Sequence, residues 1–507
     1  MFLSLSACQV QEFDESMSVD SDDPLNENQA FQTEFEGELP DVNPFIDTRD
    51  DPLATFSVDV DTASYTIMRR EVNAGRLPNP GRIRVEEFIN YFGYDYPAPS
   101  PDDPEPFSIT LEAAPSYFGA NKHMLRVGIK AEEVPAEQRP PTNLVFLIDI
   151  SGSMATYDKI GYVKYSLKTL VNALRPTDSI GIVVYAGDER VVLDPTPVSE
   201  RTQILNAIDS LVTGGSTNGE AGIRKAYELA EGARCVNNPA LQQNCSNAIN
   251  RVVLCTDGDF NVGLEDSALI QEVESWAGRG IALSALGYGE DNLDDAFLED
   301  LTNRGNGNYY YIDSHNQAKR VLVEQLGGTM QIVAKDVKVQ VEFNPDVISR
   351  YRLVGYENRV LDDDDFADDK VDAGDIGSGH TVTAFLEFEL REDVKRGSGL
   401  QVEVEPEFVE TQFIDVRVRY KQPDSDTSQE VVKIVPLGSM HSTFDEATDD
   451  FRFAAAVSEF AEILRFSPHA EGARFDDVHA LAQGALGNQS ENRSEFLDLV
   501  LKAKALF

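Results

Sequence analysis

The stretch that decides the fold is Asn143-Leu-Val-Phe-Leu-Ile-Asp149-Ile-Ser151-Gly-Ser153. Its five consecutive apolar residues, 144–148, are typical of a strand buried on both faces of a parallel sheet. This strand leads directly into a polar Asp-x-Ser-x-Ser loop. Further apolar runs of strand length are expected to pair with it, at residues 180–185, 252–255, 281–286 and 309–312.

Segments of helical period separate these strands, at residues 159–174, 202–211, 221–232 and 268–276. Alternating strands and helices over roughly 180 residues predict an α/β domain with a doubly wound, mostly parallel sheet. Helices are expected on both faces of that sheet. We place this domain at residues 141–328.

The flanks of the α/β domain are predicted to be β-rich. Residues 106–130 alternate between apolar and polar side chains, and so do the later segments 337–343, 381–390, 413–420 and 431–435. Two arrangements are open. The flanks form either one β-sandwich, in which residues 106–130 pair with residues 336–435, or two separate domains.

These patterns divide the rest of the chain into an N-terminal flanking region at 52–140, a β-rich domain at 329–440 and a C-terminal helical segment at 441–507. The first contains helical stretches at 63–72 and 84–91. In the last, the apolar residues recur on one helical face that we expect to be core: Phe453, Val457, Phe460 and Leu464.

The composition restricts the partners of the chain. Its 507 residues contain 88 Asp and Glu against 43 Lys and Arg, a formal net charge of −45. Such a charge repels nucleic acid and anionic lipid, and it favours cations and basic partners. We therefore expect no nucleic-acid ligand.

The loop after the first strand offers a set of oxygen donors. Asp149, Ser151 and Ser153 supply one carboxylate and two hydroxyls where a doubly wound sheet places its ligands. Thr217, in a Gly-rich loop before a helix, and Asp257, after the strand 252–255, are expected at the same edge. Hard oxygen donors without Cys or His favour Mg²⁺, with Ca²⁺ or Mn²⁺ as alternatives, over zinc.

These five residues resemble the metal-ion-dependent adhesion site of von Willebrand factor type A domains. The resemblance implies that Ser151 and Ser153 coordinate the metal directly, and that Thr217 and Asp257 contact it directly or through water. It also implies that an Asp or Glu of a partner protein occupies a remaining position. In that family, the final helix of the domain, here near residues 317–326, shifts with ligand binding.

Three segments of the flanks extend the resemblance to nearly the whole chain: Phe56–Tyr65, Arg84–Tyr91 and Gly374–His380. They are similar to a bacterial family in which a type A domain lies between two characteristic regions. The resemblance implies a protein of the cell envelope, often a lipoprotein.

The beginning of the chain fits that location. Leu5-Ser6-Ala7-Cys8 resembles a bacterial lipobox, and we expect Cys8 to carry a lipid that anchors the protein to a membrane. A chance match is the alternative, because a secretory signal begins with basic residues and the first one here is Arg49. Residues 1–8 are then part of a lipoprotein signal, and residues 9–51 are predicted to be a disordered acidic tether.

A binding module without enzymatic activity is the leading functional interpretation, because the chain contains no HExxH, GxSxG or P-loop motif. Two alternatives stay open: a scaffold subunit of an ATP-driven chelatase or remodelling complex, and a metal-dependent hydrolase. Whether Cys235 and Cys245 form a disulfide is also open.

Overall fold

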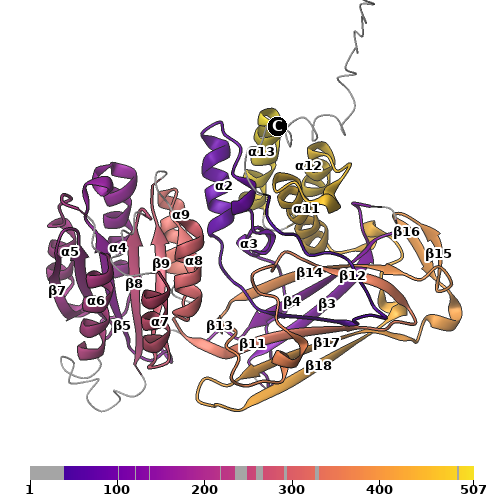
Figure 1. Cartoon of the computed structure of the whole chain (residues 1–507), viewed down its shortest axis with the longest axis horizontal. Coiled ribbons are helices and arrows are strands. Elements are labelled where there is room, and N and C mark those ends of the chain that lie inside the picture. The colour runs from indigo at the N-terminus through magenta and orange to yellow at the C-terminus, as the bar shows by residue number, and fades with distance from the viewer. Residues whose placement is uncertain are drawn as a thin grey trace, which may run out of the picture.

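The computed structural model describes residues 39–507 except 101, 120, 136, 217–218, 234–247, 259–265, 290–293, 326–329 and 488–489. An α/β domain lies beside a β-sandwich, and a group of helices covers one face of the sandwich (Figure 1). The two terminal regions of the chain together build the sandwich and the helical group, so the α/β domain is inserted between them.

The α/β domain contains a six-stranded sheet in the order β10-β9-β8-β5-β6-β7. All neighbouring strands are parallel except β7, which is antiparallel to β6. The strands are β5 (Thr142–Asp149), β6 (Ser179–Tyr185), β7 (Glu189–Pro197), β8 (Ile249–Thr256), β9 (Ile281–Gly287) and β10 (Tyr309–Tyr311). The predicted doubly wound sheet is confirmed, and the edge strand β7 is an addition that the apolar pattern did not indicate.

Both faces of this sheet are covered by helices. On β5, Leu144, Phe146 and Ile148 belong to one hydrophobic core, whereas Val145 and Leu147 belong to the core on the other face. This alternation explains why the strand is apolar at every position. The helices are α4 (Tyr162–Ala173), α5 (Arg201–Asp209), α6 (Gly219–Ala233), α7 (Asp266–Ala277), α8 (Asp295–Arg304) and α9 (His315–Lys319).

The two flanks share one β-sandwich. One sheet has the order β1-β12-β14-β4-β3, and the other has the order β13-β11-β17-β18 with β2 also paired to β11. The first contains β1 (Ile46–Asp47), β3 (Phe107–Pro115), β4 (His123–Ala131), β12 (Ile348–Val354) and β14 (Thr381–Leu390). The second contains β2 (Leu53–Ser57), β11 (Ile332–Phe343), β13 (Gly374–Gly377), β17 (Gln412–Lys421) and β18 (Ser428–Pro436), while β15 (Lys395–Ser398) and β16 (Gln401–Val404) form a separate hairpin.

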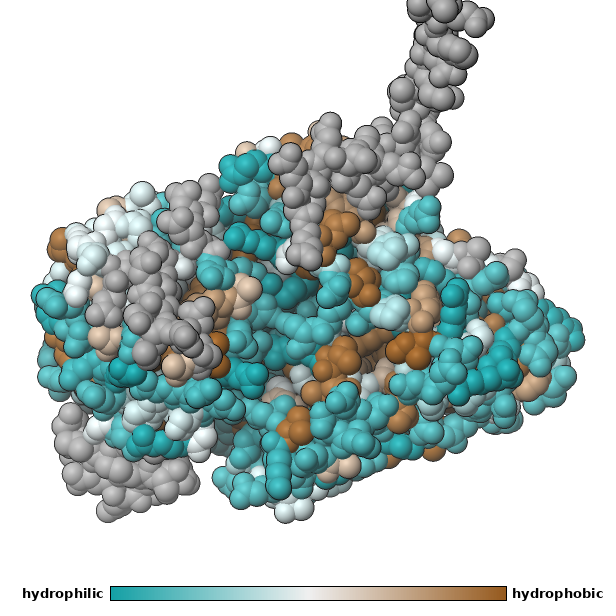
Figure 2. All heavy atoms as spheres, in the orientation of Figure 1, coloured by the Kyte–Doolittle hydropathy of each residue, from teal (hydrophilic) through white to brown (hydrophobic). Residues whose placement is uncertain are grey.

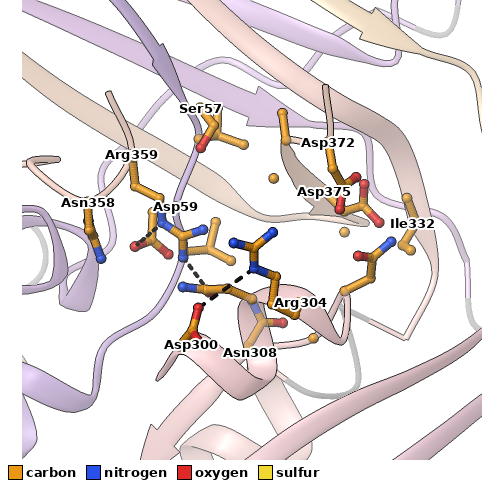
Figure 3. A pocket seen from close by; sticks show the side chains of 18 of the residues that line it. Ser57, Asp59, Asp300, Arg304, Asn308, Ile332, Asn358, Arg359, Asp372 and Asp375 are labelled. Carbon is orange, nitrogen blue, oxygen red and sulfur yellow. Dashed lines mark hydrogen bonds and ion pairs between the residues drawn. The ribbon is translucent and has the colours of Figure 1, made fainter. Parts of the chain in front are cut away.

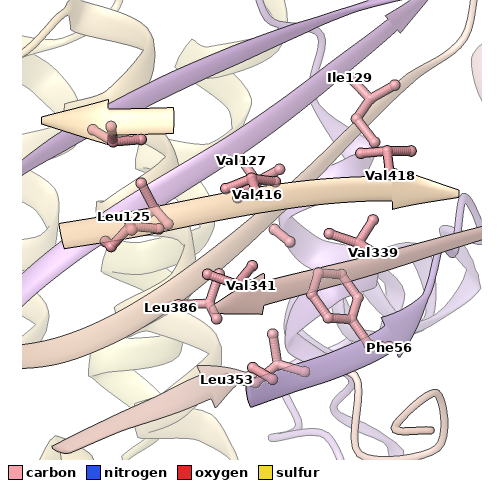
Figure 4. Packing of buried hydrophobic residues seen from close by; sticks show 14 of the residues in the cluster. Phe56, Leu125, Val127, Ile129, Val339, Val341, Leu353, Leu386, Val416 and Val418 are labelled. Carbon is pink, nitrogen blue, oxygen red and sulfur yellow. The ribbon is translucent and has the colours of Figure 1, made fainter. Parts of the chain in front are cut away.

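Pairing between β4 and β14 joins residues that lie on opposite sides of the α/β domain in the sequence. The prediction that residues 106–130 pair with residues 336–435 is therefore confirmed. Figure 4 shows the core between the sheets, where Val127 of β4 lies near Val416 of β17 and Leu386 of β14 lies near Val341 of β11. Closing the sandwich requires both flanks, so it cannot form from one of them alone.

The prediction of a disordered tether is wrong for the residues up to Asp51 that the structure describes. Residues 46–47 form β1 and pair with β12, and the side-chain amide of Asn43 donates to the carbonyl oxygens of Leu353 and Gly355 at 3.2 and 2.7 Å. The segment lacks an apolar period because it is held by hydrogen bonds to an existing sheet edge, which need no such period.

The helical group also combines both flanks. Its helices are α2 (Ala63–Asn73), α3 (Val85–Tyr91), α11 (Asp449–Leu464), α12 (Phe475–Gly484) and α13 (Ser490–Leu506). They share a core in which Phe88 and Phe92 pack with Phe460 and Phe453. The four apolar residues predicted to face the core, from Phe453 to Leu464, are all buried, as expected.

The surface reflects the high charge of the chain. Hydrophilic side chains cover most of the face drawn in Figure 2, and hydrophobic ones form smaller areas between them. Among the described residues, the helices are too short or too polar to cross a bilayer.

Candidate metal site

The loop after β5 gathers three of the predicted metal ligands. Asp149 ends the strand, and its Oδ1 accepts a hydrogen bond of 2.7 Å from the backbone N–H of Ser151. The hydroxyls of Ser151 and Ser153 are 2.9 Å apart. Asp149 and Ser151 are buried, and Ser153 is half-buried. One carboxylate and two hydroxyls are thus held together by a short turn.

The Gly-rich loop at Gly214 and Gly215 packs on this turn. The N–H of Gly152 donates to the carbonyl of Gly215 at 3.2 Å, and the N–H of Gly214 donates to the carbonyl of Ile150 at 2.7 Å. Both loop glycines have positive φ, 151° and 108°, which side chains disfavour. The loop is therefore held against the first one up to this point, and Thr217 lies outside the described residues.

Asp257 follows the carboxyl end of β8, which is the neighbour of β5 in the sheet. It is completely buried, and its Oδ2 accepts a hydrogen bond of 3.0 Å from the ammonium of Lys159. Because Ile148 of β5 pairs with Cys255 of β8, Asp149 and Asp257 leave adjacent strands at the same edge of the sheet.

Each of the two carboxylates retains a buried oxygen without a hydrogen bond. Asp149 Oδ2 and Asp257 Oδ1 have no partner among the residues that the structure describes. Burial raises the pKa of Asp149 to about 6, and repulsion from Asp257 adds to the shift while hydrogen bonds from Ser151 oppose it. Unpaired buried carboxylate oxygens are costly, so this donor set fits a cation.

Lys159 is the site residue that the sequence patterns missed. It is buried and belongs to a π-helical turn at Tyr157–Gly161 between the first loop and α4. Gly289, with a φ of 82°, lies against this side chain, and a Cβ there would displace the lysine. It begins the helical stretch predicted at residues 159–174, and only the fold brings it to Asp257.

The cysteines add little to the site. Cys8, Cys235 and Cys245 lie outside the described residues. Cys255 is buried in β8, and burial raises the pKa of its thiol to about 12, which keeps it protonated and unreactive.

A second polar region lies at the amino ends of the parallel strands, where the α/β domain meets the sandwich. Here a cleft of about 310 Å³ is lined by Arg251 near the start of β8 and by residues of α8, β2 and β13. Figure 3 shows Asp59 and Arg359 on one side of the cleft and Asp372 and Asp375 on the other.

Two of the three characteristic flank segments line this cleft. Ser57–Val60 come from the first segment, and Gly374, Asp375 and Gly377 come from the third. A Cβ on Gly374 would lie 2.1 Å from the carbonyl oxygen of Val58, so the two segments are in close backbone contact. These segments therefore build the junction between the domains.

The second flank segment fixes α8 to the same junction. Arg84 donates to Asp295 at 2.6 Å, contacts Glu299 at 3.0 Å and pairs with Glu87. Asp61 of the first segment accepts a hydrogen bond of 3.1 Å from the backbone N–H of Tyr309. Tyr309 begins β10, an edge strand of the sheet, so Asp61 pairs with a backbone group of that edge. The charged residues of these segments thus hold the inserted domain in place.

A doubly wound sheet with an Asp-x-Ser-x-Ser loop at its carboxyl edge defines a von Willebrand factor type A domain. The family model described as von Willebrand factor type A domain matches residues 143–325. A model described as von Willebrand factor matches residues 31–126, and a model described as the C-terminal region of the uncharacterized protein YfbK matches residues 328–506.

Among the relatives, the protein described as uncharacterized protein YfbK of Escherichia coli is 38% identical over 471 residues, which covers 91% of this chain and 79% of that protein. The chain belongs to the YfbK family of von Willebrand factor type A domain proteins. The human inter-alpha-trypsin inhibitor heavy chain H2 is 31% identical over 172 residues, 33% of this chain and 17% of that protein.

Solved structures of similar fold include the von Willebrand factor type A protein from Catenulispora acidiphila. The comparison gives a TM-score of 0.43 and 16% identity, and it covers 78% of this chain and 90% of that one.

Proposed function

We propose that the type A domain binds one divalent cation and uses it to bind an acidic side chain of a partner protein. The ligands are Asp149, Ser151, Ser153, Thr217 and Asp257, and the cation is Mg²⁺, with Ca²⁺ or Mn²⁺ as alternatives. The type A fold supports a protein-interaction role. The observation that carries the proposal is a pair of buried oxygens, Asp149 Oδ2 and Asp257 Oδ1, that no described residue contacts by a hydrogen bond.

The chain's own residues set the charge of the site. The two serines contribute neutral hydroxyls, and Lys159 offsets part of the charge of Asp257. The protein therefore supplies little more than one net negative charge. A cation held there would keep enough positive charge to bind a carboxylate from outside, as oxygen-coordinated Mg²⁺ does.

The proposed location is the cell envelope, with the protein held to a membrane by a lipid on Cys8. This proposal rests on the lipobox-like Leu5-Ser6-Ala7-Cys8. Labelled palmitate should be incorporated into the full chain in a bacterial host and not into Cys8→Ser. Equal labelling of both chains would contradict it.

Metal binding is tested first on the purified chain by isothermal titration with MgCl₂, CaCl₂ and MnCl₂. Asp149→Ala should abolish the binding, whereas the matched control Asp209→Asn should preserve it, because Asp209 is exposed on α5 and its carboxylate pairs with Lys168 at the surface. Absence of binding by the unmodified chain would refute the proposal.

The partner is then tested by affinity capture from the source cells with and without EDTA, using the unmodified chain, Asp149→Ala and Asp209→Asn. A protein ligand of the site should be retained by the unmodified chain and by Asp209→Asn, and lost in EDTA and with Asp149→Ala. A protein captured equally in EDTA and by Asp149→Ala binds at another part of the chain, which would contradict the proposal.

A further inference from the structure

A cleft of about 670 Å³ lies where α2, α9 and α13 meet. Figure 1 shows α9 of the α/β domain beside α2 of the N-terminal flank. The cleft has an unusual charge for so acidic a chain, with four cationic side chains and two carboxylates in its lining. These are Arg69, Arg70, Lys319 and Arg320, and Asp313 and Glu495.

Two of the four cations are already neutralised by the protein. Arg69 forms two hydrogen bonds of 2.7 Å with the carboxylate of Asp313 and a longer contact of 3.2 Å with Glu495. Arg70 pairs with Asp158 at 3.1 Å. These arginines tie α2 to the α/β domain and are therefore part of the framework of the cleft.

The other two cations, Lys319 and Arg320, have no ion pair within the described part of the chain. Lys319 is exposed at the end of α9. Arg320 donates a hydrogen bond to the backbone carbonyl of Tyr91, and its guanidinium carbon lies 4.0 Å from the centre of that ring. The contact with Tyr91 orients Arg320 without neutralising its charge.

Gln317 provides a separate sign of a missing ligand. Its side chain is 2% exposed and lines the cleft. The Oε1 atom accepts from Arg69 at 3.3 Å and from the hydroxyl of Tyr91 at 3.4 Å, whereas the Nε2 donor has no partner among the described residues. A buried N–H donor without an acceptor is destabilising, and an oxyanion would satisfy it.

We propose that this cleft is a binding site for a small dianionic oxyanion, of the phosphate or dicarboxylate type. Lys319 and Arg320 give two cationic donors for a dianion, and the amide of Gln317 adds a directed donor. Glu495, the second carboxylate on Arg69, lowers the net positive charge of the cleft to one. The net charge of −45 repels anions from the molecule as a whole, so an anion binds here only because the local charge is positive. The site is separate from Asp149 and does not depend on the proposed metal.

The test is isothermal titration of the full chain with inorganic phosphate and, separately, with succinate. The buffer is metal-free, slightly above neutral pH and held at constant ionic strength with NaCl. Binding of phosphate alone identifies a phosphate-type ligand, and binding of succinate alone identifies a dicarboxylate. Absence of binding by both overturns the proposal.

Three variants locate the binding. Lys319→Gln and Arg320→Gln should each weaken it about tenfold, the usual order for one charge-assisted contact. Gln317→Met should weaken it without a change in charge. The matched control is Lys370→Gln, which removes the charge of an exposed lysine in the sandwich and should leave binding unchanged.

Asp149→Ala separates this site from the candidate metal site, and it should retain anion binding. If Asp149→Ala loses the anion, or if Lys319→Gln and Arg320→Gln bind as well as Lys370→Gln, the anion lies elsewhere and the proposal is overturned.

Discussion

Two groups of buried carboxylates in and beside the type A domain differ in their surroundings. At the junction with the flanks, Arg84 contacts three of them, Glu87, Asp295 and Glu299. At the carboxyl edge of the sheet, Lys159 pairs with Asp257, and no Lys or Arg among the described residues pairs with Asp149. Arg84 therefore has a structural role at the junction, whereas the charge of Asp149 suits a cation from outside.

The strongest way to break this comparison is to remove the cation of the junction. Arg84→Met should lower the free energy of unfolding by about 3–5 kcal/mol, because it strands buried carboxylates without their partner. Urea denaturation measures the change. Arg304→Met is the control, since Arg304 pairs with Asp300 at the surface over 3.8 Å and should cost at most about 1 kcal/mol. If the two changes lower the free energy of unfolding equally, Arg84 does not have the structural role proposed for it.

The opposite outcome is expected at the candidate metal site. Asp149→Asn should lower Mg²⁺ affinity by at least about 100-fold, since it removes a charged ligand. In metal-free buffer it should not destabilise the fold, because it also removes an unpaired buried charge. Calorimetric titration and denaturation of the same sample measure both quantities.

Asp295→Asn serves as the matching change at the junction, where a paired carboxylate is lost and stability should fall. If Asp149→Asn destabilises the metal-free protein as much as Asp295→Asn does, the two places do not differ in the proposed way.

A pH series sharpens the comparison at Glu86, which accepts from the N–H of Tyr356 at 2.9 Å. Burial raises the pKa of Glu86 from 4.5 to about 8, with repulsion from Glu357 and Asp59 adding to the shift. The folded state therefore holds a proton that the unfolded state releases, and stability is lost as pH rises toward 8.

The unmodified chain should lose stability between about pH 6 and pH 8, and in Glu86→Gln this loss should be smaller by about 1–2 kcal/mol. Urea denaturation at the two pH values measures it, and Glu71→Gln, a change of a more accessible carboxylate on α2, is the control. An unchanged pH slope in Glu86→Gln would show that another group carries the dependence.

The smallest expected effect concerns Lys159. Lys159→Met should raise Mg²⁺ affinity by about three- to tenfold, because it removes a positive charge beside Asp257. The exposed pair of Lys168 with Asp209 gives the control, Lys168→Met, which should leave affinity unchanged. A loss of affinity in Lys159→Met would instead mean that Lys159 positions Asp257 for the metal.

Much of the fold could be predicted from local patterns. The continuous apolar runs at β5, β6 and β8 predicted a parallel sheet covered on both faces, and the period-2 segments predicted the sandwich strands. The pattern missed β7 because it is an edge strand whose exposed residues need not be apolar. It also failed to predict that residues 39–51 are ordered, because their pairing with β12 depends on a sheet formed by residues far away in the sequence.

The candidate metal site likewise contains residues that local sequence identified and one that it did not. Asp149, Ser151 and Ser153 lie in one loop, and their spacing identified them. Thr217 and Asp257 were predicted from their places after strands and before helices. Lys159 could not be found from its local sequence, because its contact with Asp257 spans 98 residues. The cleft at Lys319 and Arg320 also escaped prediction, since it joins helices from three regions of the chain.

The sequence by itself determined the class of the domain, its oxygen-rich loop and the alternation of its strands, because these depend on neighbours within a few residues. Only the tertiary structure decided which buried charges are paired. A carboxylate is neutralised by whatever cation the fold brings within a few ångströms, and the arginines and lysines that do so here come from distant parts of the chain.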